Sequence, residues 1–312
     1  MENIAIVMGG YSEEKDISLQ SGETIYTYID LNKYTPYKVI CRNKNKFHVI
    51  LNSEKIEINN KDFSFLRKNK QVKFDKVFMM IHGKPGENGQ LCSFFESKKI
   101  PYTSSGQISS ELTFNKFKCN KHLKQLGYTV PESNIFTKKD AIKYPSIIKP
   151  IASGSSFGIN KVNNKQELKQ AIDQANKYSD EIIVEEFIDG RELTCGVFSI
   201  SGKVKALPIT EIISENEIFD YDAKYNGKST EETPAKINSS VRMKIEDISK
   251  KIYRDLKLSG VIRVDFIMKD TQPYIIEINT IPGFSEKSIV PQMLKSANIN
   301  IRTFISEQLE NI

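Results

Sequence analysis

The stretches Val261-Ile-Arg-Val-Asp-Phe-Ile-Met268 and Tyr274-Ile-Ile-Glu-Ile-Asn279, near the C-terminal end, decide how the rest of the chain is interpreted. The turn-forming residues between them, at 269–273, predict a β-hairpin. Side chains alternate between the two faces of a strand, so each of these strands has one apolar and one polar face. We expect Met268 to face Tyr274 across the hairpin. The apolar face of the second strand is then expected to carry Tyr274, Ile276 and Ile278.

The polar face of this hairpin brings two acids together. In the expected register Asp265 lies across from Glu277, and Arg263 lies across from Asn279. Directly opposed residues have Cβ atoms about 5 Å apart, where like charges are destabilising. A hard divalent cation such as Mg²⁺ would explain the pair, because it binds oxygen ligands and shares them with substrate phosphates. An exposed polar face on which Arg263 neutralises both acids would explain it too.

The composition is that of an ordinary globular protein. Its 312 residues, 39% of them hydrophobic, suffice for two or three domains. The net charge of +6 is spread over 45 basic and 39 acidic residues, which does not indicate a nucleic-acid partner. Four scattered cysteines without a CxxC pair are typical of a reduced cytoplasmic protein. We recognise no signal peptide and no apolar run of about 18 residues, so we expect no membrane span.

The N-terminal residues show the pattern of an open α/β sheet. The apolar run at 3–8 predicts a buried parallel strand that ends in Gly9-Gly10. A helix is expected over 18–30, with Ser18 as its N-cap. A glycine turn between strand and helix forms a crevice in such sheets, and Glu14 lies at its mouth. An exposed loop acid is the other interpretation of Glu14.

A second apolar strand is expected at 76–81, and His82 follows it directly, at the start of a glycine-rich turn. Open α/β sheets bind their ligands at this end of a strand, so His82 is a candidate site residue. A helix is expected over 90–98. The polar stretch 101–106 then reads as a linker, which predicts a domain boundary near residue 105.

The central part of the chain carries two lysines next to features that suit phosphate binding. A helical stretch is expected over 109–126 and contains Lys116. A short strand at 145–149 presents Lys149 to the Gly/Ser-rich loop 150–158. Such a loop can bind phosphate through backbone N–H groups and hydroxyls, although it is not a Walker A loop and simple flexibility is the alternative.

The remaining segments predict strands, a helix and one long loop. The apolar strand that begins at 182 contains two acids, which indicates that they pair or bind a ligand. Another strand is expected to begin at 206–209, and a helix at 242–258. The stretch 214–235 is polar without periodicity, as lids of compact enzymes often are. One or two helices are expected from 292 to the end.

Taken in order, these motifs resemble those of the D-alanine–D-alanine ligases of the ATP-grasp family. The resemblance spans residues 9–291 and rests on seven separated motifs, which makes it specific. They are GGYSEEKDISLQSG (9–22), HGKPGENG (82–89), KPIASGSSFG (149–158), VEEFIDGRE (184–192), YDAKY (221–225), RVDF (263–266) and EINTIPGFSEKS (277–288).

The resemblance implies an ATP-grasp fold of three domains, α/β in its N-terminal pre-ATP-grasp part and α+β beyond it. We expect an N-terminal Rossmann-like domain over 1–105, a central domain over 106–184, and a C-terminal domain over 185–312 with the metal site and the lid. The implied activity is the ATP-dependent joining of two D-alanines through a D-alanyl phosphate, for peptidoglycan precursors. ATP and two Mg²⁺ ions (or Mn²⁺) are the implied cofactors, and a homodimer without nucleic-acid or membrane partners is the implied assembly.

The resemblance also implies a role for each residue that matches a family motif. Phosphate contacts are implied for Lys116, Lys149, Ser156 and Lys224. Contacts to adenine and ribose are implied for Glu185, Phe187, Ile188 and Glu192. The metal ligands would be Asp265, Glu277 and Asn279. The catalytic set would be Glu14, Ser155, Tyr225, Arg263 and Gly283, with His82 near the first D-alanine and Ser288 at the carboxylate of the second.

Three positions depart from the family's usual pattern: Asn115, Asn88 and Glu186. Three other functions stay open beside the implied one. A sibling ligase could couple D-alanine to D-lactate or D-serine, and another carboxylate–amine ligase could use the same scaffold. A non-catalytic nucleotide-binding regulator is the third, against which Arg263 and the three metal-ligand candidates argue. A tyrosine at position 225 favours an amine acceptor, because its hydroxyl stays neutral at neutral pH.

Overall fold

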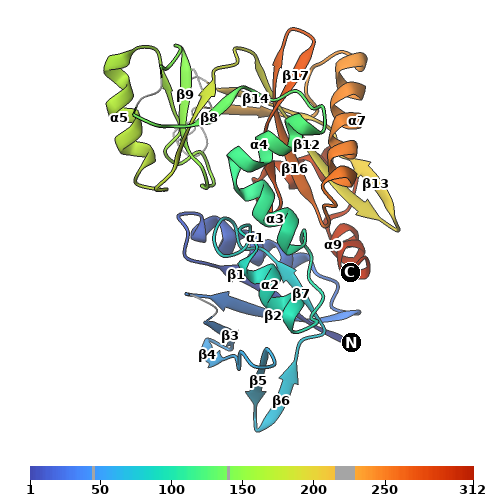
Figure 1. Ribbon diagram of the computed structural model, residues 1–312. Coiled ribbons are helices and arrows are strands. Elements are labelled where there is room, and N and C mark those ends of the chain that lie inside the picture. Colours follow the sequence, from blue (N-terminus) through green and yellow to red (C-terminus); the bar gives the residue numbers. More distant parts are fainter. Residues whose placement is uncertain (44–45, 139–140, 215–228) are drawn as a thin grey trace.

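The computed structural model describes residues 1–43, 46–138, 141–214 and 229–312. In these residues the strands form three larger sheets and one two-stranded ribbon, with helices between and around them (Figure 1). This arrangement confirms the mixed α/β class that the sequence predicts. None of the described helices combines the length and apolar character needed to cross a membrane.

The N-terminal sheet has the strand order β4-β3-β2-β1-β7, with β1 parallel to both of its neighbours. Its strands are β1 (Glu2–Gly9), β2 (Tyr34–Cys41), β3 (Phe47–Leu51), β4 (Glu54–Glu57) and β7 (Lys76–Met79). The buried parallel strand predicted at 3–8 is therefore confirmed as β1. The ribbon of β5 (Ser64–Arg67) and β6 (Lys70–Lys73) and the helix α2 (Gln90–Ser97) complete this region.

Helix α1 (Lys15–Tyr28) begins three residues before the predicted start, so the assignment of Ser18 as N-cap is wrong. Ser18 lies buried inside the helix instead. Its hydroxyl accepts the Gly9 N–H at 2.8 Å and donates to the Met80 carbonyl at 2.6 Å. The serine thus satisfies backbone groups at the ends of β1 and of the neighbouring strand, where the sheet leaves them unpaired.

The single helical stretch predicted over 109–126 is two helices, α3 (Gln107–Phe114) and α4 (Lys116–Gln125). Asn115 separates them because its backbone is extended. Its side chain accepts the Lys118 N–H at 2.9 Å and caps α4. The break places Lys116 at the first turn of a helix rather than in the middle of one.

The second sheet has the order β10-β9-β11-β8 and is covered by α5 (Lys165–Ala175) (Figure 1). Its strands are β8 (Ser133–Ile135), β9 (Ser146–Pro150), β10 (Asn160–Val162) and β11 (Ile182–Glu186). The third sheet has the order β15-β14-β12-β16-β17, β13 pairs with β12, and α7 (Ser239–Asp255) packs against β12 and β13. Its strands are β12 (Arg191–Ile200), β13 (Lys203–Ala206), β14 (Thr210–Ser214), β15 (Ser229–Glu232), β16 (Ile262–Lys269) and β17 (Gln272–Asn279).

Two predictions for this third sheet need correction. The strand expected at 206–209 is replaced by β13 and β14 on either side, since Pro208 has no N–H for a central ladder. The stretch 214–235, expected to lack regular structure, contains β15, which pairs with β14. Residues 215–228 of the expected lid lie outside the described residues.

The hairpin of β16 and β17 contains a β-bulge, which the sequence analysis did not foresee. Met268 pairs with Pro273 and Ile267 with Tyr274, so the predicted pairing of Met268 with Tyr274 is wrong. The register shifts after Asp265, and Ile276 is the extra residue of the second strand.

Beyond the bulge the predicted register is confirmed, with Asp265 opposite Glu277 and Arg263 opposite Asn279. The buried apolar residues of β17 are consequently Ile275 and Ile278 rather than residues at a strict spacing of two. Strict alternation from Ile275 onward, with Ile276 kept in the ladder, would turn Glu277 towards the core. The bulge thus keeps both acids on the same polar face.

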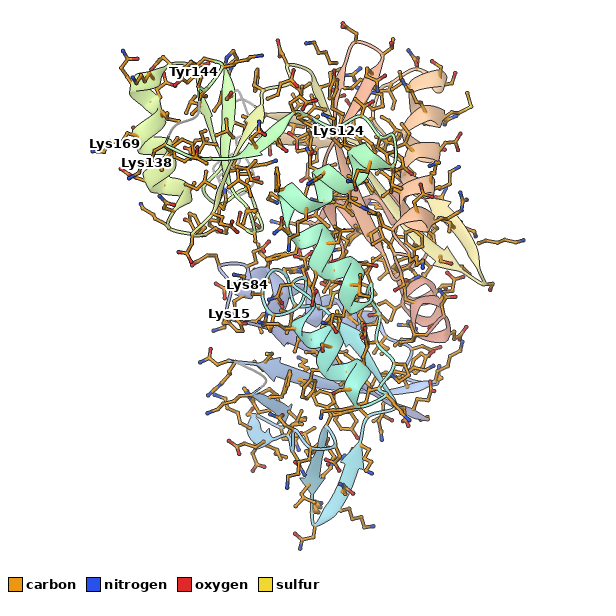
Figure 2. All side chains as sticks on the ribbon, in the orientation of Figure 1. Lys15, Lys84, Lys124, Lys138, Tyr144 and Lys169 are labelled. Carbon is orange, nitrogen blue, oxygen red and sulfur yellow. The ribbon has the colours of Figure 1, made fainter. Side chains whose placement is uncertain are left out.

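The last two helices, α8 (Ile289–Ser296) and α9 (Ile301–Glu310), pack into the apolar core of the N-terminal sheet. Phe304 of α9 contacts both Phe198 of β12 and Phe284, at ring-centroid distances of 5.1 and 5.9 Å. The two ends of the chain therefore share one core (Figure 1). The labelled lysines of Figure 2 are spread over the molecule: Lys15, Lys124 and Lys169 lie on α1, α4 and α5, and Lys84 and Lys138 lie in connecting segments.

Candidate active site

Asp265 is the centre of a dense hydrogen-bonded group on the polar face of the hairpin. Arg263 binds it in a bidentate manner, with Nε at 2.8 Å from Oδ1 and Nη2 at 2.9 Å from Oδ2. Thr194 of β12 donates to Oδ1 at 2.6 Å and Asn279 donates to Oδ2 at 2.9 Å. Burial opposes the charge on Arg263, but Asp265 outweighs it, and the pKa of the guanidinium is raised.

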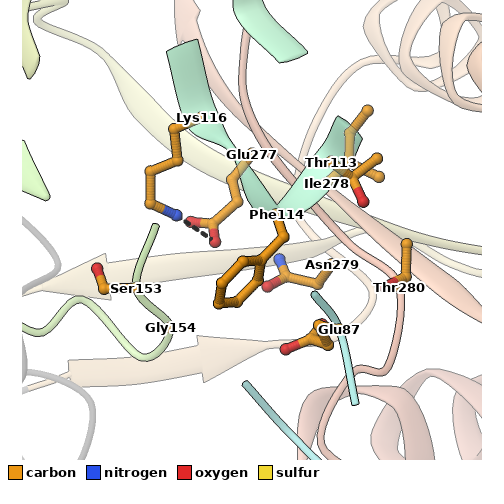
Figure 3. A pocket seen from close by; sticks show the side chains of 10 residues that line it. All are labelled: Glu87, Thr113, Phe114, Lys116, Ser153, Gly154, Glu277, Ile278, Asn279 and Thr280. Carbon is orange, nitrogen blue, oxygen red and sulfur yellow. Dashed lines mark hydrogen bonds and ion pairs between the residues drawn. The ribbon is translucent and has the colours of Figure 1, made fainter. Parts of the chain in front are cut away.

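The second acid, Glu277, pairs with Lys116 at 2.7 Å between Oε1 and Nζ. Figure 3 shows this pair from close by, with Phe114 and Asn279 beside it. Burial alone would lower the pKa of Lys116, yet the Glu277 carboxylate more than offsets this and the pKa is raised. The lysine predicted to contact phosphate is therefore held as a cation at the start of α4.

The donor chemistry of the hairpin fits a hard divalent cation. Asp265, Glu277 and Asn279 offer two carboxylates and one amide oxygen, the ligand types that Mg²⁺ prefers. No group of three or more His, Cys, Asp or Glu side chains suitable for a metal occurs in the part of the chain that the structure describes. A cation at this place would share Asp265 with Arg263 and would compete with Lys116 for Glu277.

Lys149 of β9 forms a buried ion pair with Glu185 of β11, at 2.6 Å between Nζ and Oε1. Next to this strand, the Lys161 ammonium lies over the Phe187 ring, 4.1 Å from its centroid, and Ile188 is buried. Lys149, Lys161 and Glu185 belong to strands of the second sheet, and Phe187 and Ile188 directly follow β11. Glu185, which is expected to contact adenine, therefore lies next to Lys149, which is expected to bind phosphate. Glu192 lies near the start of β12.

Glu14 connects the N-terminal sheet to the Gly/Ser-rich loop, because Ser155 donates a short hydrogen bond to its Oε1. The loop approaches so closely that a Cβ at Gly154 would lie 1.9 Å from Glu14 Oε2. Ser155 and Ser156 both have positive φ angles, 47° and 58°. Glu14 and Ser155 are members of the catalytic set that the resemblance implies, and they meet although 141 residues separate them.

His82 closes a ring of hydrogen bonds with the loop that follows β17. Its Nδ1 lies 2.6 Å from the Ile281 carbonyl, which only accepts, so Nδ1 carries the proton. Nε2 then accepts from the Ser21 hydroxyl at 3.0 Å, and Ser21 accepts the Phe284 N–H at 3.0 Å. Burial lowers the pKa of His82, which agrees with a neutral imidazole.

Ser288 and Gly283 lie side by side at the end of this loop. The Ser288 hydroxyl is within 2.8 Å of the Ser285 hydroxyl and accepts the Ser285 N–H at 3.1 Å. A Cβ at Gly283 would lie only 3.0 Å from Ser288 Oγ. Glycine at this position therefore leaves the backbone accessible next to the serine.

A cavity of about 370 Å³ brings seven of the predicted residues together. This volume lies in the range of small-molecule sites. The predicted residues that line it are Glu14, His82, Ser155, Arg263, Asn279, Gly283 and Ser288. A smaller pocket beside it is lined by Lys116, Glu277 and Asn279 among others (Figure 3). The predicted residues that line neither are Lys149, Ser156, Glu185, Phe187, Ile188, Glu192 and Asp265. Lys224 and Tyr225 lie outside the described residues.

Three residues of the site were missed by the sequence analysis: Glu87, Thr194 and Ser21. Glu87 lines both pockets and accepts the N–H groups of Gly83 and Ile281 at 2.8 and 3.1 Å. Burial raises its pKa to about 8. Its position inside the glycine-rich turn was a usable signal. Nothing in the local sequence distinguishes Thr194 or Ser21, because their partners come from distant segments.

Comparison with known proteins agrees with this geometry. The family descriptions "D-ala D-ala ligase N-terminus" and "D-ala D-ala ligase C-terminus" match residues 3–105 and 120–310. The chain belongs to the D-alanine–D-alanine ligase family. It is 41% identical to the D-alanine–D-alanine ligase of Flavobacterium johnsoniae, over 99% of both chains.

Two solved structures extend the comparison to the D-alanine–D-alanine ligase fold, which is the ATP-grasp fold that the sequence predicts. A D-Ala:D-Ser ligase from Enterococcus faecalis has a TM-score of 0.87 and 30% identity, over 99% of this chain and 98% of that one. The D-alanine–D-alanine ligase of Bacillus anthracis complexed with ATP has a TM-score of 0.78 and 27% identity, over 99% and 97%.

The three departures from the usual D-alanine–D-alanine ligase motifs lie outside both pockets. Asn115 caps α4 as an aspartate would. Asn88 accepts the Gln90 N–H at the start of α2, at 3.4 Å. Glu186 is exposed and accepts the Glu132 N–H at 3.3 Å. Each residue therefore has a local structural role that its chemistry explains.

Proposed function

We propose that this protein joins two D-alanine molecules to D-alanyl-D-alanine while it converts ATP to ADP and phosphate. The observation that carries the proposal is the meeting of Glu14, Ser155, Arg263, Gly283 and Ser288 around one cavity, in a chain that belongs to this ligase family over its whole length. The product would serve peptidoglycan precursor synthesis, which places the protein in the cytoplasm.

ATP binding is proposed between the second and third sheets. Glu185, Phe187 and Ile188 would contact adenine, and Glu192 would contact the ribose. The phosphates would be bound by Lys116, Lys149, Ser156 and Lys224. Lys116 and Lys149 are already paired with carboxylates, so each would exchange one anionic partner for another. Such an exchange avoids leaving a buried ammonium without a counter-charge.

Asp265, Glu277 and Asn279 would hold Mg²⁺, with Mn²⁺ as a substitute and two ions as the proposed number. The metal ions would neutralise charge on the phosphate groups when bound. The chain itself supplies Arg263 beside this group. Its pairing with Asp265 orients the guanidinium on the polar face of the hairpin.

In the proposed reaction the carboxylate of the first D-alanine attacks the γ-phosphate of ATP, the bond from the γ-phosphorus to the bridging oxygen breaks, and an acyl phosphate and ADP form. The amine of the second D-alanine then attacks the acyl carbon, and phosphate leaves. Arg263 and the Gly283 N–H would stabilise the oxyanion that forms. Ser288 would bind the carboxylate of the second D-alanine. Glu14 and Ser155, joined by Tyr225, would close the site against water.

A sibling activity with D-serine or D-lactate as acceptor is the second candidate, because the D-Ala:D-Ser ligase of Enterococcus faecalis has the same fold at 30% identity. ADP release should be measured with D-alanine, with L-alanine and without amino acid. We expect release with D-alanine alone. No release with any amino acid would favour a nucleotide-binding regulator. A competition of D-alanine with excess D-lactate or D-serine identifies the acceptor, and a mixed product would overturn the assignment.

The domain boundaries near residues 105 and 184 and a homodimeric assembly are part of the same proposal. Limited proteolysis followed by mass spectrometry should place the first cuts near these boundaries. Light scattering with the purified chain should give twice the mass of 35.6 kDa. A monomer at micromolar concentration would rule out the dimer.

A further inference from the structure

The last helix and the active-site loop meet at a small cavity behind the catalytic pocket. Gln308 of α9 and Thr280, the residue after β17, both line this cavity, which has a volume of about 10 Å³. Each residue is only 2% exposed. In the part of the chain that the structure describes, Gln308 Nε2 and Thr280 Oγ1 are buried and have no hydrogen-bond partner.

Two orphaned polar atoms at one cavity point to a bound ligand. A buried polar atom that loses its hydrogen bond costs enough to change a folding equilibrium about tenfold, so native proteins rarely leave one unpaired. A volume of about 10–15 Å³ is what a single water molecule requires. A water molecule also needs at least two polar partners, and these two side chains supply an N–H donor and a hydroxyl.

We propose that one buried water molecule bridges Gln308 and Thr280 and thereby ties α9 to the active-site loop. Gln308 Nε2–H donates to the water oxygen, and the Thr280 hydroxyl forms the second bond. Thr280 also lines the pocket that contains Lys116 and Glu277, so it lies between that pocket and the water site.

The bridge would position the backbone between two groups of the site. Thr280 directly follows Asn279, and the next residue, Ile281, binds Glu87 through its N–H and His82 through its carbonyl. Gly283 follows two residues later. Gln308 and Thr280 are thus positioning residues that touch no reacting atom. This functional part of the inference rests on the proposed ligase activity, whereas the water site itself does not.

A high-resolution crystal structure of the full chain tests the water site directly. We expect one ordered water molecule within hydrogen-bond distance of both Gln308 Nε2 and Thr280 Oγ1. Density without a water molecule there, or a direct hydrogen bond between the two side chains, would overturn the proposal.

A double-mutant cycle tests the bridge in solution. Thr280→Val and Gln308→Met keep the side-chain sizes and remove the polar atoms. Each single variant leaves the other polar atom poorly satisfied and should raise the unfolding equilibrium constant about tenfold. The double variant removes both groups, so its constant should lie at least fivefold below the product of the two single effects. A double variant that matches this product within twofold would contradict the bridge.

The conservative variant Thr280→Ser distinguishes the effect of the Thr280 hydroxyl, which would bind the water molecule, from the packing of its methyl group. It keeps the hydroxyl, so its kcat for ADP release with D-alanine should stay within twofold of the wild-type value, while Thr280→Val loses about tenfold. Equal loss in both variants would show that the threonine methyl group matters rather than the hydroxyl. The crystal structure and the unfolding cycle decide the water site even if the wild-type protein forms no dipeptide, so the two failures are distinguishable.

Discussion

Each buried cation of the site is matched with one carboxylate: Arg263 with Asp265, Lys116 with Glu277 and Lys149 with Glu185. Burial of a single charge is costly, and a close partner reduces this cost. The pairs therefore keep two lysines and one arginine charged inside the protein, where anionic phosphate groups would meet them. Removal of either partner leaves the other with an uncompensated charge.

Replacement of Glu277 by glutamine tests this arrangement. The variant loses one proposed metal ligand and the partner of Lys116, so its rate of ADP release should fall at least about 100-fold. Because Lys116 is buried and Glu277 is partly exposed, unfolding should become easier by about 1–3 kcal/mol. Steady-state kinetics and urea denaturation measure the two effects. The control Glu246→Gln on α7, which loses an ion pair with Arg242 at 3.9 Å, should change neither. Near-normal turnover of Glu277→Gln would refute the role.

Glu87 gives the protein a pH-dependent stability. Its folded pKa of about 8 lies above the ordinary value, so between about pH 5 and pH 8 the folded state binds more protons than the unfolded state. Stability contributed by the protonated acid is therefore lost as the pH rises through this window. Urea denaturation at pH 5, 6.5 and 8 should show wild-type stability falling relative to that of Glu87→Gln, which does not titrate. Parallel pH profiles of the two proteins would contradict the assignment.

At the scale of secondary-structure elements, the β-bulge leaves Ile276 out of the ladder, so Glu277 lies on the polar face of β17. Deletion of Ile276 removes this extra residue and should give a regular ladder in which Glu277 still lies opposite Asp265 and Ile278 still enters the core covered by α7. Both acids keep their face, so the free energy of unfolding should stay within about 1–2 kcal/mol of the wild-type value and ADP release with D-alanine should persist. Urea denaturation and steady-state kinetics measure the two effects, and the control Ile276→Val, which keeps the bulge, should retain both. An unfolded or inactive deletion variant would mean that the bulge itself is required.

The sequence predicted the elements that have strong local patterns and missed those that depend on distant partners. The predicted pairing of Met268 with Tyr274 is one residue off, and the bulge at Ile276 compensates for this error, so Asp265 still lies opposite Glu277. The sequence does not predict the bulge, because an apolar side chain such as that of Ile276 is compatible with either face of the strand. The strands between residues 34 and 73 were not predicted, since their polar and apolar residues alternate weakly. Ser18 was predicted as a helix cap because serine is common at N-caps. Its real partners, Gly9 and Met80, come from other segments of the chain, which local sequence does not indicate.

At the scale of the whole molecule, α9 joins the end of the chain to its beginning. Phe304, Ile305 and Leu309 are fully buried, and Lys76 donates to the Leu309 carbonyl at 2.9 Å. Local periodicity predicted a terminal helix but could not tell which core it would enter. The site depends on this closure, because the loop from Thr280 to Ser288 lies between the third sheet and these helices.

Truncation after Asn300 tests the role of α9 in the N-terminal core. Loss of the three buried side chains removes about 5–9 kcal/mol of apolar burial, which is comparable to the total stability of a domain. The truncated protein should be largely insoluble or unfolded, as judged by soluble yield and circular dichroism. Removal of only Asn311, which is exposed, and Ile312, which is half-buried at the rim of the core, is the matched control and should leave the protein folded. A soluble, folded truncation product would show that the N-terminal sheet is stable alone.

The three hydrogen bonds through His82 form a chain that begins and ends in the loop after β17. It starts at the Phe284 amide, passes through Ser21 and the imidazole, and returns to the Ile281 carbonyl three residues earlier. All three dipoles run in the same sense, so each bond polarises the next. An imidazolium would donate from both ring nitrogens, so the Ser21 hydroxyl would have to rotate and could no longer donate to Nε2. The neutral imidazole is therefore the form of His82 that preserves all three hydrogen bonds.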